Sequence, residues 1–354
     1  MSWEEKVRKV TPYIPGEQPR DSEKVIKLNT NEMPYPPSPK VSEALANFDA
    51  KKLRLYPEPD VAPLRNALAD KYGVGRDEMF VGVGSDDVLS VAFLTFFDSD
   101  SPILFPDITY SFYDVWADLY RIPYAVKPLD DDFHIVKADY MCPNGGIVIA
   151  NPNAPTGVSE DADIDFIEDI VRANPDSVVI VDEAYVDFGG VSALPLIKKY
   201  DNVLIVRTFS KSRAFAGMRI GYAMGCAKLI GYMNDVKYSI NSYTMNRPAI
   251  ELGIASLSDD EYFKKTVDAI IRTRQWTINE LRERGFAVTD SKTNFVFASP
   301  SKISAKELFE RLKERRIFVR WWDKPRLREY LRISVGTDEE MRAFIDAVDD
   351  ITEK

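Results

Sequence analysis

One lysine lies in a position suited to covalent chemistry. Lys211 comes shortly after the apolar run 203–206, the hydroxyl residues Thr208 and Ser210 precede it, and Arg219 follows eight residues later. A desolvated lysine just beyond a buried strand can act as a nucleophile and form a Schiff base with an aldehyde. The alternative is a solvated loop lysine, which fits less well with the hydroxyls and the arginine around it.

An aspartate follows a second apolar run in the same way. Asp182 comes directly after residues 178–181, which are all β-branched, and Tyr185 follows three residues later. A carboxylate at a buried strand end needs a cationic or N–H partner, because unpaired burial is costly. We therefore expect Asp182 to meet such a partner in a ligand, the alternative being that it only caps a turn.

Two further segments bring polar groups to the ends of apolar runs. Gly84, Ser85 and Asp86 precede an apolar helix, where free N–H groups and the positive end of the helix dipole favour a phosphate. The alternative there is that Asp86 is only an N-cap. Asn153 lies in the loop 151–157, which two prolines make rigid, and its amide can donate to a phenolate oxygen. By itself that loop is a turn.

A single ligand accounts for all four segments. Pyridoxal phosphate (PLP) has an aldehyde for Lys211, a phosphate for the hydroxyls and Arg219, a ring nitrogen for Asp182 and a phenolic oxygen for Tyr185. A protein that uses this cofactor holds its ring and tunes its electronic properties. The sequence therefore predicts a PLP site.

Short apolar runs alternate with helical patterns between residues 60 and 230. The runs are 80–83, 103–105, 147–150, 178–181, 203–206 and 220–224, and the helical patterns are 61–72, 86–97 and 162–173. Such an alternation is typical of a mainly parallel sheet that is buried on both faces. Because ligands of these sheets bind beyond the carboxyl ends of the strands, we expect the polar residues after the runs to meet at one edge.

We expect three parts in the 354-residue chain: an N-terminal arm (1–45) that packs with the small domain, a large PLP-binding domain (46–258) and a small C-terminal domain (259–354). The dense prolines between residues 11 and 40 favour extended structure in the arm. A long amphipathic helix, 259–284, ends at Gly285 and bridges the two domains. Strand-like segments at 286–290, 294–298, 317–321 and 330–335, with helices at 305–315 and from 338, form the small α/β domain.

The amino-acid composition limits the kinds of partner that we expect for this protein. Lys and Arg total 46 against 56 Asp and Glu, a net charge of -10, so the sequence lacks the basic field that nucleic-acid binding needs. A single histidine, His134, and two isolated cysteines, Cys142 and Cys226, predict neither a metal site nor a Ser-His-Asp triad. No apolar stretch is long enough to span a membrane, and the N-terminus shows no targeting segment. We therefore expect a cytoplasmic protein without a membrane or nucleic-acid partner.

Short segments spread nearly from end to end of the chain carry a family resemblance. They are PYIPG (12–16), KLNTNEMPYPPSP (27–39), LYPEP (55–59), GVGSDD (82–87), ITYSFY (108–113), NPNAPTG (151–157), VDEAYVDF (181–188), TFSKSRAFAGMRIGY (208–222) and LRISVGT (331–337). With these segments the sequence resembles the fold-type I PLP-dependent aminotransferases, and within them the histidinol-phosphate aminotransferase family. The resemblance implies an α/β fold: a large domain with a mainly parallel seven-stranded sheet between helices, a smaller α/β C-terminal domain and an N-terminal arm.

The resemblance also implies a role for each candidate residue. Lys211 is the Schiff-base lysine, Asp182 pairs with the ring nitrogen and Tyr185 with the ring hydroxyl. Tyr110 stacks on the ring face, and Tyr56 reaches the phosphate of the neighbouring subunit's cofactor in a homodimer. The phosphate is surrounded by Ser85, Asp86, Thr208, Ser210 and Arg219, with Gly84 allowing close backbone approach.

Three further features concern the surroundings of the substrate. Arg320 and Arg332 are implied to hold the anionic part of the substrate. Ala154 departs from the family pattern, which usually has an asparagine there to contact the ring hydroxyl; Asn153 can substitute if the loop shifts. The tandem pair Trp321 and Trp322 belongs either to the wall of the substrate pocket or to domain packing.

The expected activity is PLP-dependent transamination. The resemblance implies that L-histidinol phosphate and 2-oxoglutarate give imidazole acetol phosphate and glutamate, as in histidine biosynthesis, with Lys211 as nucleophile and general base. Threonine-phosphate decarboxylases and aromatic amino acid aminotransferases are similar and stay open as alternatives. A non-catalytic regulator that reuses the fold is less consistent, because no segment is spare for a DNA-binding domain and Lys211 is intact.

Overall fold

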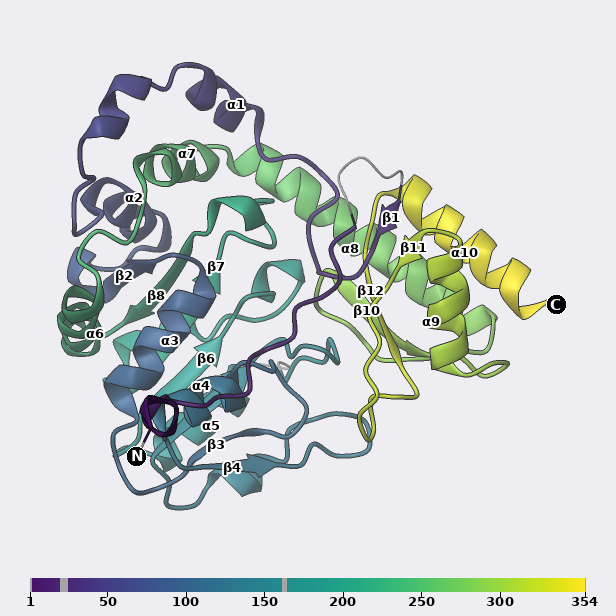
Figure 1. The fold of residues 1–354 in the computed structure, drawn as a ribbon, viewed down its shortest axis with the longest axis horizontal. Helices are drawn as coiled ribbons and strands as arrows, with labels where there is room; N and C mark the ends of the chain where they lie inside the picture. The colour runs from purple at the N-terminus through teal and green to yellow at the C-terminus, as the bar shows by residue number, and fades with distance from the viewer. Residues whose placement is uncertain (1, 20–24, 161–163, 354) are drawn as a thin grey trace.

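A seven-stranded, mainly parallel sheet forms the centre of the larger part of the molecule (Figure 1). The computed structural model describes residues 2–19, 25–160 and 164–353. The strand order is β2-β8-β7-β6-β5-β3-β4; β8 runs antiparallel to both neighbours, and the pairs from β7 to β4 are parallel. The strands are β2 (Met79–Gly82), β3 (Ile103–Pro106), β4 (Tyr124–Lys127), β5 (Gly146–Ala150), β6 (Val179–Asp182), β7 (Val203–Thr208) and β8 (Gly221–Gly225). The predicted fold class is confirmed.

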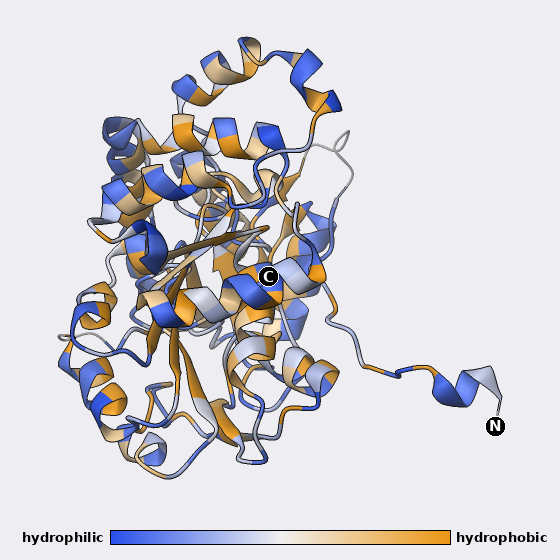
Figure 2. Ribbon diagram, turned by 90° about the vertical axis from the view of Figure 1, so that its left-hand side faces the viewer, coloured by the Kyte–Doolittle hydropathy of each residue, from blue (hydrophilic) through white to orange (hydrophobic). Residues whose placement is uncertain are grey.

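Helices cover both faces of this sheet, because its strands are apolar on both sides. Along β7, Val203 and Ile205 join one core cluster, and Leu204 and Val206 join another on the opposite face, as the two-residue period of a strand requires. The first cluster is shared with α2 (Ala62–Tyr72), α5 (Asp165–Ala173) and α7 (Arg247–Leu257), the second with α3 (Ser85–Phe96), α4 (Tyr113–Tyr120) and α6 (Ala227–Ile240). Hydrophobic residues accordingly follow the strands inside the molecule (Figure 2).

The C-terminal part of the chain forms a smaller α/β unit beside the large sheet (Figure 1). The long helix α8 (Asp260–Glu283) leads into a three-stranded antiparallel sheet in the order β12-β10-β9. After α8, the elements of this smaller unit are β9 (Ala287–Val288), β10 (Phe295–Ser299), α9 (Ala305–Glu314), β11 (Ile317–Phe318), β12 (Leu331–Ser334) and α10 (Asp338–Thr352). They share one hydrophobic core, to which α8, α9 and α10 all contribute.

The N-terminal arm contacts both units. Its strand β1 (Ile26–Lys27) pairs in parallel with β11, and Leu28 is buried in the core of the small unit. Helix α1 (Pro39–Ala46) packs against α7, and Tyr13 stacks on Phe112 of the large unit with ring centroids 4.4 Å apart. Between the short 3-10 helix Trp3–Lys6 and Pro39, the described residues of the arm form no helix, because a proline fits the first position of a helix but not its interior. This route carries residues 29–32 past the edge of the large sheet.

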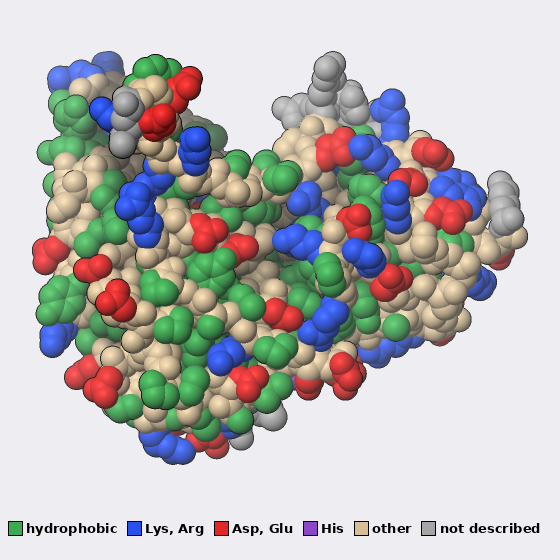
Figure 3. Space-filling view, turned by 60° about the horizontal axis from the view of Figure 1, so that its bottom comes forward, with side chains coloured by type: hydrophobic (Ala, Val, Ile, Leu, Met, Phe, Trp, Pro, Cys, Tyr) green, Lys and Arg blue, Asp and Glu red, His purple; other side chains and the backbone are tan. Residues whose placement is uncertain are grey.

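Six strands and α-helices of the described chain have no counterpart among the predicted ones: β1, α1, β4, α4, α6 and α7. Strand β4 is an edge strand whose residues alternate between exposed and half-buried, so it lacks the continuous apolar run of the central strands. The predicted helix 162–173 begins outside the described residues, and α5 is described from Asp165. Within the described ranges no helix is long and apolar enough to cross a membrane. On the face shown in Figure 3, basic and acidic side chains are interspersed.

Candidate active site

Nine of the predicted ligand-binding residues converge on one cavity of about 230 Å³ beyond the carboxyl ends of β5, β6 and β7. The lining of this cavity does not include Gly84, Asn153, Arg320, Arg332 or Tyr56. Its predicted lining residues are Ser85, Asp86, Tyr110, Asp182, Tyr185, Thr208, Ser210, Lys211 and Arg219. The others are Thr30, Glu32, Ala150, Pro152, Ala154, Ala184 and Ala216. Two of these, Thr30 and Glu32, come from the N-terminal arm, and sequence reasoning missed them.

Asp182, the last residue of β6, is a buried acid with no cationic partner among the described residues. Its Oδ2 accepts a hydrogen bond of 2.9 Å from the hydroxyl of Tyr113, and its Oδ1 accepts one of 3.2 Å from the N–H of Ala184. Burial raises the pKa of the Asp182 carboxyl to about 6, and these two hydrogen bonds oppose the rise only in part. A cation supplied by a ligand would restore the ionised form. Tyr113, on α4, is a contact that the sequence did not reveal.

Lys211 lies in the turn after β7 and has few partners. Its Nζ donates a hydrogen bond of 3.4 Å to the carbonyl oxygen of Thr30 and lies 5.6 Å from the ring centroid of Tyr185. In the described part of the chain this amine forms no ion pair. An amine that lines a cavity and makes only a long hydrogen bond is available as a nucleophile or a base.

The N-terminus of α3 and the turn after β7 together form an anion cradle. Gly84 is the N-cap, and its φ of +87° is a backbone conformation that L side chains rarely adopt, so this position favours glycine. Thr208 donates to Ser210 over 3.0 Å, and Arg219 donates to the same hydroxyl over 3.4 Å. Helix N–H groups, hydroxyls and a guanidinium are the donors that a phosphate needs.

Asp86 connects this cradle to an aromatic ring. It accepts a hydrogen bond of 2.8 Å from the hydroxyl of Tyr110 and pairs with Arg219 over 3.2 Å. The interpretation of Asp86 as an N-cap is wrong, because Gly84 occupies that position and no side chain caps the helix. Burial, reinforced by the charge of Asp86, raises the pKa of Tyr110 well above its usual value, so this ring stays a neutral donor.

The N-terminal arm also holds Tyr185. Nδ2 of Asn31 donates a hydrogen bond of 2.9 Å to the Tyr185 oxygen, and the Ser334 hydroxyl donates to Oδ1 of Asn31 over 3.1 Å. Because the Tyr185 oxygen accepts from Asn31, its own hydrogen is free to be donated to a ligand. No local pattern could have predicted Asn31, since it lies 154 residues from Tyr185 in the chain.

Asn153 is turned away from the cavity. Its Oδ1 accepts from Thr109 over 2.8 Å, and its Nδ2 donates to the carbonyl of Ile108 over 2.9 Å and to Thr156 over 3.0 Å. With both ends of the amide engaged, Asn153 holds its own loop together, and Ala154 lines the cavity instead. The expected substitution of Asn153 for the family asparagine does not occur in this geometry.

Arg320 and Arg332 lie opposite each other in an antiparallel bridge, joined by backbone hydrogen bonds of 3.0 and 2.9 Å. The Arg332 guanidinium donates to the carbonyl of Asn29 over 2.9 Å, and that of Arg320 to the carbonyls of Ile14 over 3.2 Å and Pro15 over 3.4 Å. Burial lowers the pKa of Arg332, and the cavity tyrosines oppose this. Neither arginine has a carboxylate partner within the described ranges.

Tyr56 lies on the surface, outside the cavity of its own chain. Its side chain is 77% exposed and stacks on Tyr243 with ring centroids 4.6 Å apart. Its carbonyl accepts a hydrogen bond of 2.7 Å from Arg247. A role in the site of a second subunit stays a prediction.

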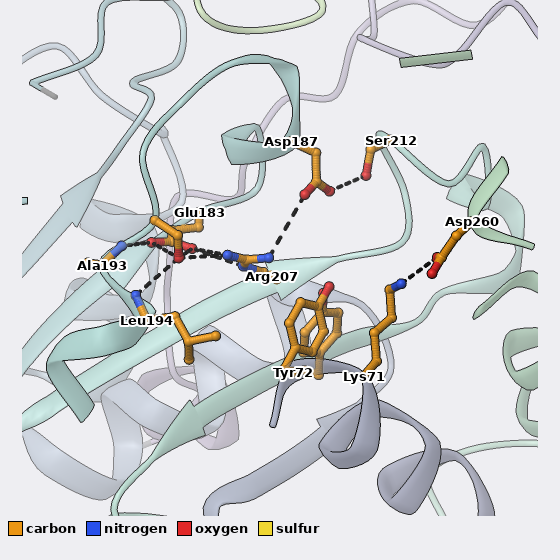
Figure 4. Close-up of polar contacts among 11 residues, drawn as sticks. Lys71, Tyr72, Glu183, Asp187, Ala193, Leu194, Arg207, Ser212 and Asp260 are labelled. Carbon is orange, nitrogen blue, oxygen red and sulfur yellow. Dashed lines mark hydrogen bonds and ion pairs between the residues drawn. The ribbon is translucent and has the colours of Figure 1, made fainter. Parts of the chain in front are cut away.

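A polar network joins residues that are next to cavity residues in the chain (Figure 4). Glu183 follows the cavity aspartate, Arg207 precedes the cavity threonine, and they are joined by contacts of 2.9 and 2.8 Å. Asp187 lies 3.9 Å from Arg207 and accepts a hydrogen bond of 2.5 Å from Ser212, which follows the cavity lysine. Paired buried charges of this kind hold a backbone in one arrangement. The network therefore ties together the segments that carry the aspartate, the threonine and the lysine.

The cavity fits PLP group by group. A buried carboxyl without a cation suits a protonated ring nitrogen, a tyrosine hydrogen suits the ring hydroxyl oxygen, a free amine suits the aldehyde, and the anion cradle suits the phosphate. The class of protein follows from comparison: residues 23–348 match the family described as aminotransferase class I and II. The chain belongs to this family, so the predicted enzyme class is confirmed.

Relatives are similar along the whole chain. A histidinol-phosphate aminotransferase of Lactococcus lactis subsp. cremoris (strain SK11) is 51% identical over 345 residues, 98% of this chain and 96% of the relative. One of Clostridium botulinum (strain Okra / Type B1) is 47% identical over 352 residues, 99% of each chain. The predicted resemblance to histidinol-phosphate aminotransferases is thus confirmed.

Solved structures agree with the fold. A histidinol-phosphate aminotransferase from Sinorhizobium meliloti in complex with pyridoxal-5'-phosphate superposes with a TM-score of 0.84 at 25% identity, covering 93% of this chain and 92% of that one. An L-threonine-O-3-phosphate decarboxylase from Porphyromonas gingivalis has a TM-score of 0.79 at 23% identity, with 93% and 100% coverage. The likeness to the decarboxylase is one of fold alone.

Proposed function

We propose that the protein uses PLP to transfer the amino group of L-histidinol phosphate to 2-oxoglutarate, releasing imidazole acetol phosphate and glutamate. The proposal is carried by an amine without an ion pair and a buried acid without a cation in one cavity. The names of relatives at 51% and 47% identity support the substrate. The decarboxylase alternative is supported by fold alone and is not favoured.

When bound, PLP supplies an aldehyde that combines with an amine and a ring that accepts electrons. We assign to Asp182 the role of keeping the ring nitrogen protonated, because that carboxyl is buried and lacks a cation as partner. Tyr185, oriented by Asn31, would donate to the ring hydroxyl oxygen. Tyr110 would pack on the ring, and the residues that would hold the phosphate are Gly84, Ser85, Asp86, Thr208, Ser210 and Arg219.

Lys211 is the group that moves the proton at the substrate's α-carbon. The other charged groups of the lining are unsuitable: a guanidinium such as Arg219 does not lose its proton, and Asp86 is paired with it. Glu32 is held by Lys27 and by the hydroxyl of Thr30. Lys211 therefore serves as nucleophile and general base, and the network that includes Ser212 holds its turn in place.

Arg320 and Arg332 bind the anionic group of each substrate in turn. Both substrates carry anionic groups: histidinol phosphate has a phosphate, and 2-oxoglutarate has two carboxylates. Guanidiniums match both anions with two parallel hydrogen bonds, and these two have no carboxylate of their own in the described part of the chain.

The active form we propose is a cytoplasmic homodimer in which Tyr56 reaches the partner's cofactor phosphate. Leu53, Leu55, Tyr56 and Tyr243 expose 59%, 50%, 77% and 44% of their surface, and such clustered apolar exposure is typical of an interface. A two-fold contact would give each subunit one tyrosine and take one from it. Each subunit would comprise an arm (1–45), a PLP-binding domain (46–258) and a small domain (259–354).

The test compares three substrates on the purified holoenzyme. We expect kcat/KM for L-histidinol phosphate, with 2-oxoglutarate as acceptor, to exceed that for phenylalanine by orders of magnitude, and threonine phosphate to release no carbon dioxide. A preference for phenylalanine, or decarboxylation of threonine phosphate, would overturn the assignment of the substrate while leaving the enzyme class intact.

A further inference from the structure

The two neighbouring tryptophans at positions 321 and 322 point into different environments. Trp321 is half-buried and packs against the core of the small unit, stacks on Phe309 at 6.1 Å and donates from Nε1 to the carbonyl of Arg328 over 2.9 Å. Trp322 instead packs against the core of the large unit. It lines a cleft of about 320 Å³ that shares Tyr110 with the central cavity. Trp321 is therefore a packing residue, whereas Trp322 lies beside the site.

Trp322 contacts both substrate-site arginines. The guanidinium carbon of Arg320 lies 5.3 Å from the centre of its ring, and that of Arg332 lies 5.2 Å from it. Arg332 is also 5.4 Å from the ring of Phe295, so aromatic faces flank it from two residues. A cation within about 6 Å of an indole face is attracted by the ring's quadrupole, and tryptophan is the strongest such partner.

The arginine pair needs a stabilising neighbour. Arg320 and Arg332 are direct cross-strand partners, and like charges in that relation repel. Among the described residues they meet backbone carbonyls but no carboxylate, and Nε of Arg332 is buried without a hydrogen-bond partner. The aromatic faces are thus what the structure provides in place of counter-charges.

We propose that Trp322 is a positioning residue that holds Arg320 and Arg332 side by side for one substrate anion. An aromatic face stabilises a cation without neutralising it and accepts none of the in-plane N–H donors. A carboxylate in the same place would compete with the substrate's phosphate or carboxylate for those donors. This inference rests on the proposed function, in which the two arginines bind that anion.

The neighbouring tryptophan supplies a matched control. In the holoenzyme, Trp322→Leu should raise KM for both L-histidinol phosphate and 2-oxoglutarate roughly tenfold, because two cation–π contacts are lost, while kcat changes little. Calorimetric titration with inorganic phosphate should show affinity weakened by a similar factor, independently of turnover. Trp321→Leu should lower thermal stability but leave both KM values and phosphate affinity unchanged. Trp322→Phe, which keeps a ring, should fall between wild type and Trp322→Leu.

The outcomes separate this inference from the proposed function. If Arg332→Ala leaves both KM values and phosphate affinity unchanged, the anion site itself is wrong and the inference falls with it. If Arg332→Ala weakens them but Trp322→Leu behaves like Trp321→Leu, only the role of Trp322 is refuted. Should Trp322→Leu fail to fold, Trp322→Phe decides alone: a rise in both KM values supports the inference, and unchanged values overturn it.

Discussion

Replacing Asp182 with asparagine should stabilise the cofactor-free protein and weaken the enzyme. Burial raises the pKa of this carboxyl from its ordinary 3.8 to about 6, so the folded state retains its proton over a pH range in which the unfolded state has lost it. Stability therefore falls as the pH rises from about 4 to beyond 6. At about 1.4 kcal/mol per pKa unit, the difference between the two pKa values lowers the free energy of unfolding by about 3 kcal/mol at pH 8. An asparagine avoids this cost, because its Oδ1 can accept from the Ala184 N–H while its Nδ2 donates to the hydroxyl oxygen of Tyr113.

The assay is urea unfolding of wild type and Asp182→Asn, both freed of cofactor, across a pH series. The free energy of unfolding of the variant should exceed that of wild type by about 3 kcal/mol at pH 8, about half of that at pH 5 and almost nothing at pH 3. With PLP bound the advantage should shrink or reverse, because the carboxylate then gains the protonated ring nitrogen as a partner. Turnover should fall sharply in the variant, with cofactor still bound.

Two results would refute this reasoning. A stability difference that does not vary between pH 3 and pH 8 would show that Asp182 titrates normally in the cofactor-free fold. Normal turnover of Asp182→Asn would show that the carboxyl serves the structure only. Tyr113→Phe is the matched control: it removes a hydrogen bond that lowers the Asp182 pKa, so the fall in stability should begin at the same pH and extend to higher pH.

Further variants test the other assignments. Lys211→Ala should lower turnover by orders of magnitude, because nucleophile and base are lost together; unchanged turnover would refute the mechanism. Arg332→Ala should raise KM for histidinol phosphate roughly 10- to 100-fold and Arg332→Lys less, since an ammonium lacks the guanidinium fork; equal effects on the two would count against two-bond recognition. Mixing inactive Tyr56→Ala subunits with inactive Lys211→Ala subunits should restore activity if Tyr56 acts across a dimer. If Tyr56 acts within its own subunit, no activity should return. Ser212→Ala should reduce kcat more than it changes either KM, because its bond to Asp187 anchors the lysine turn; an unchanged kcat would make that contact dispensable.

The sequence predicts best where a run of apolar residues ends in a polar one. Lys211 and Asp182 stand out for this reason, and the parallel sheet brings both strand ends to one edge. Strand β4 was not predicted, because an edge strand needs apolar residues on fewer sides and therefore shows no continuous apolar run.

Contacts between distant segments could not be predicted in this way. Asn31 reaches Tyr185 only because the arm threads past the sheet edge, and no periodicity encodes that path. Trp321 and Trp322 are adjacent residues of the same type, so the sequence does not distinguish them. Only their packing shows that Trp322 lies beside the site and that Trp321 packs against the core of the small unit. The direction of the Asn153 amide depends on hydrogen bonds with Thr109 and Ile108, more than 40 residues away.

A single-turnover experiment tests the central claim most directly. The holoenzyme is mixed with excess L-histidinol phosphate in the absence of 2-oxoglutarate, and imidazole acetol phosphate is quantified per active site. We predict one equivalent of product per site, then arrest, and continuous formation of product and glutamate once 2-oxoglutarate is added. No product, or carbon dioxide release in place of amino transfer, would contradict the account.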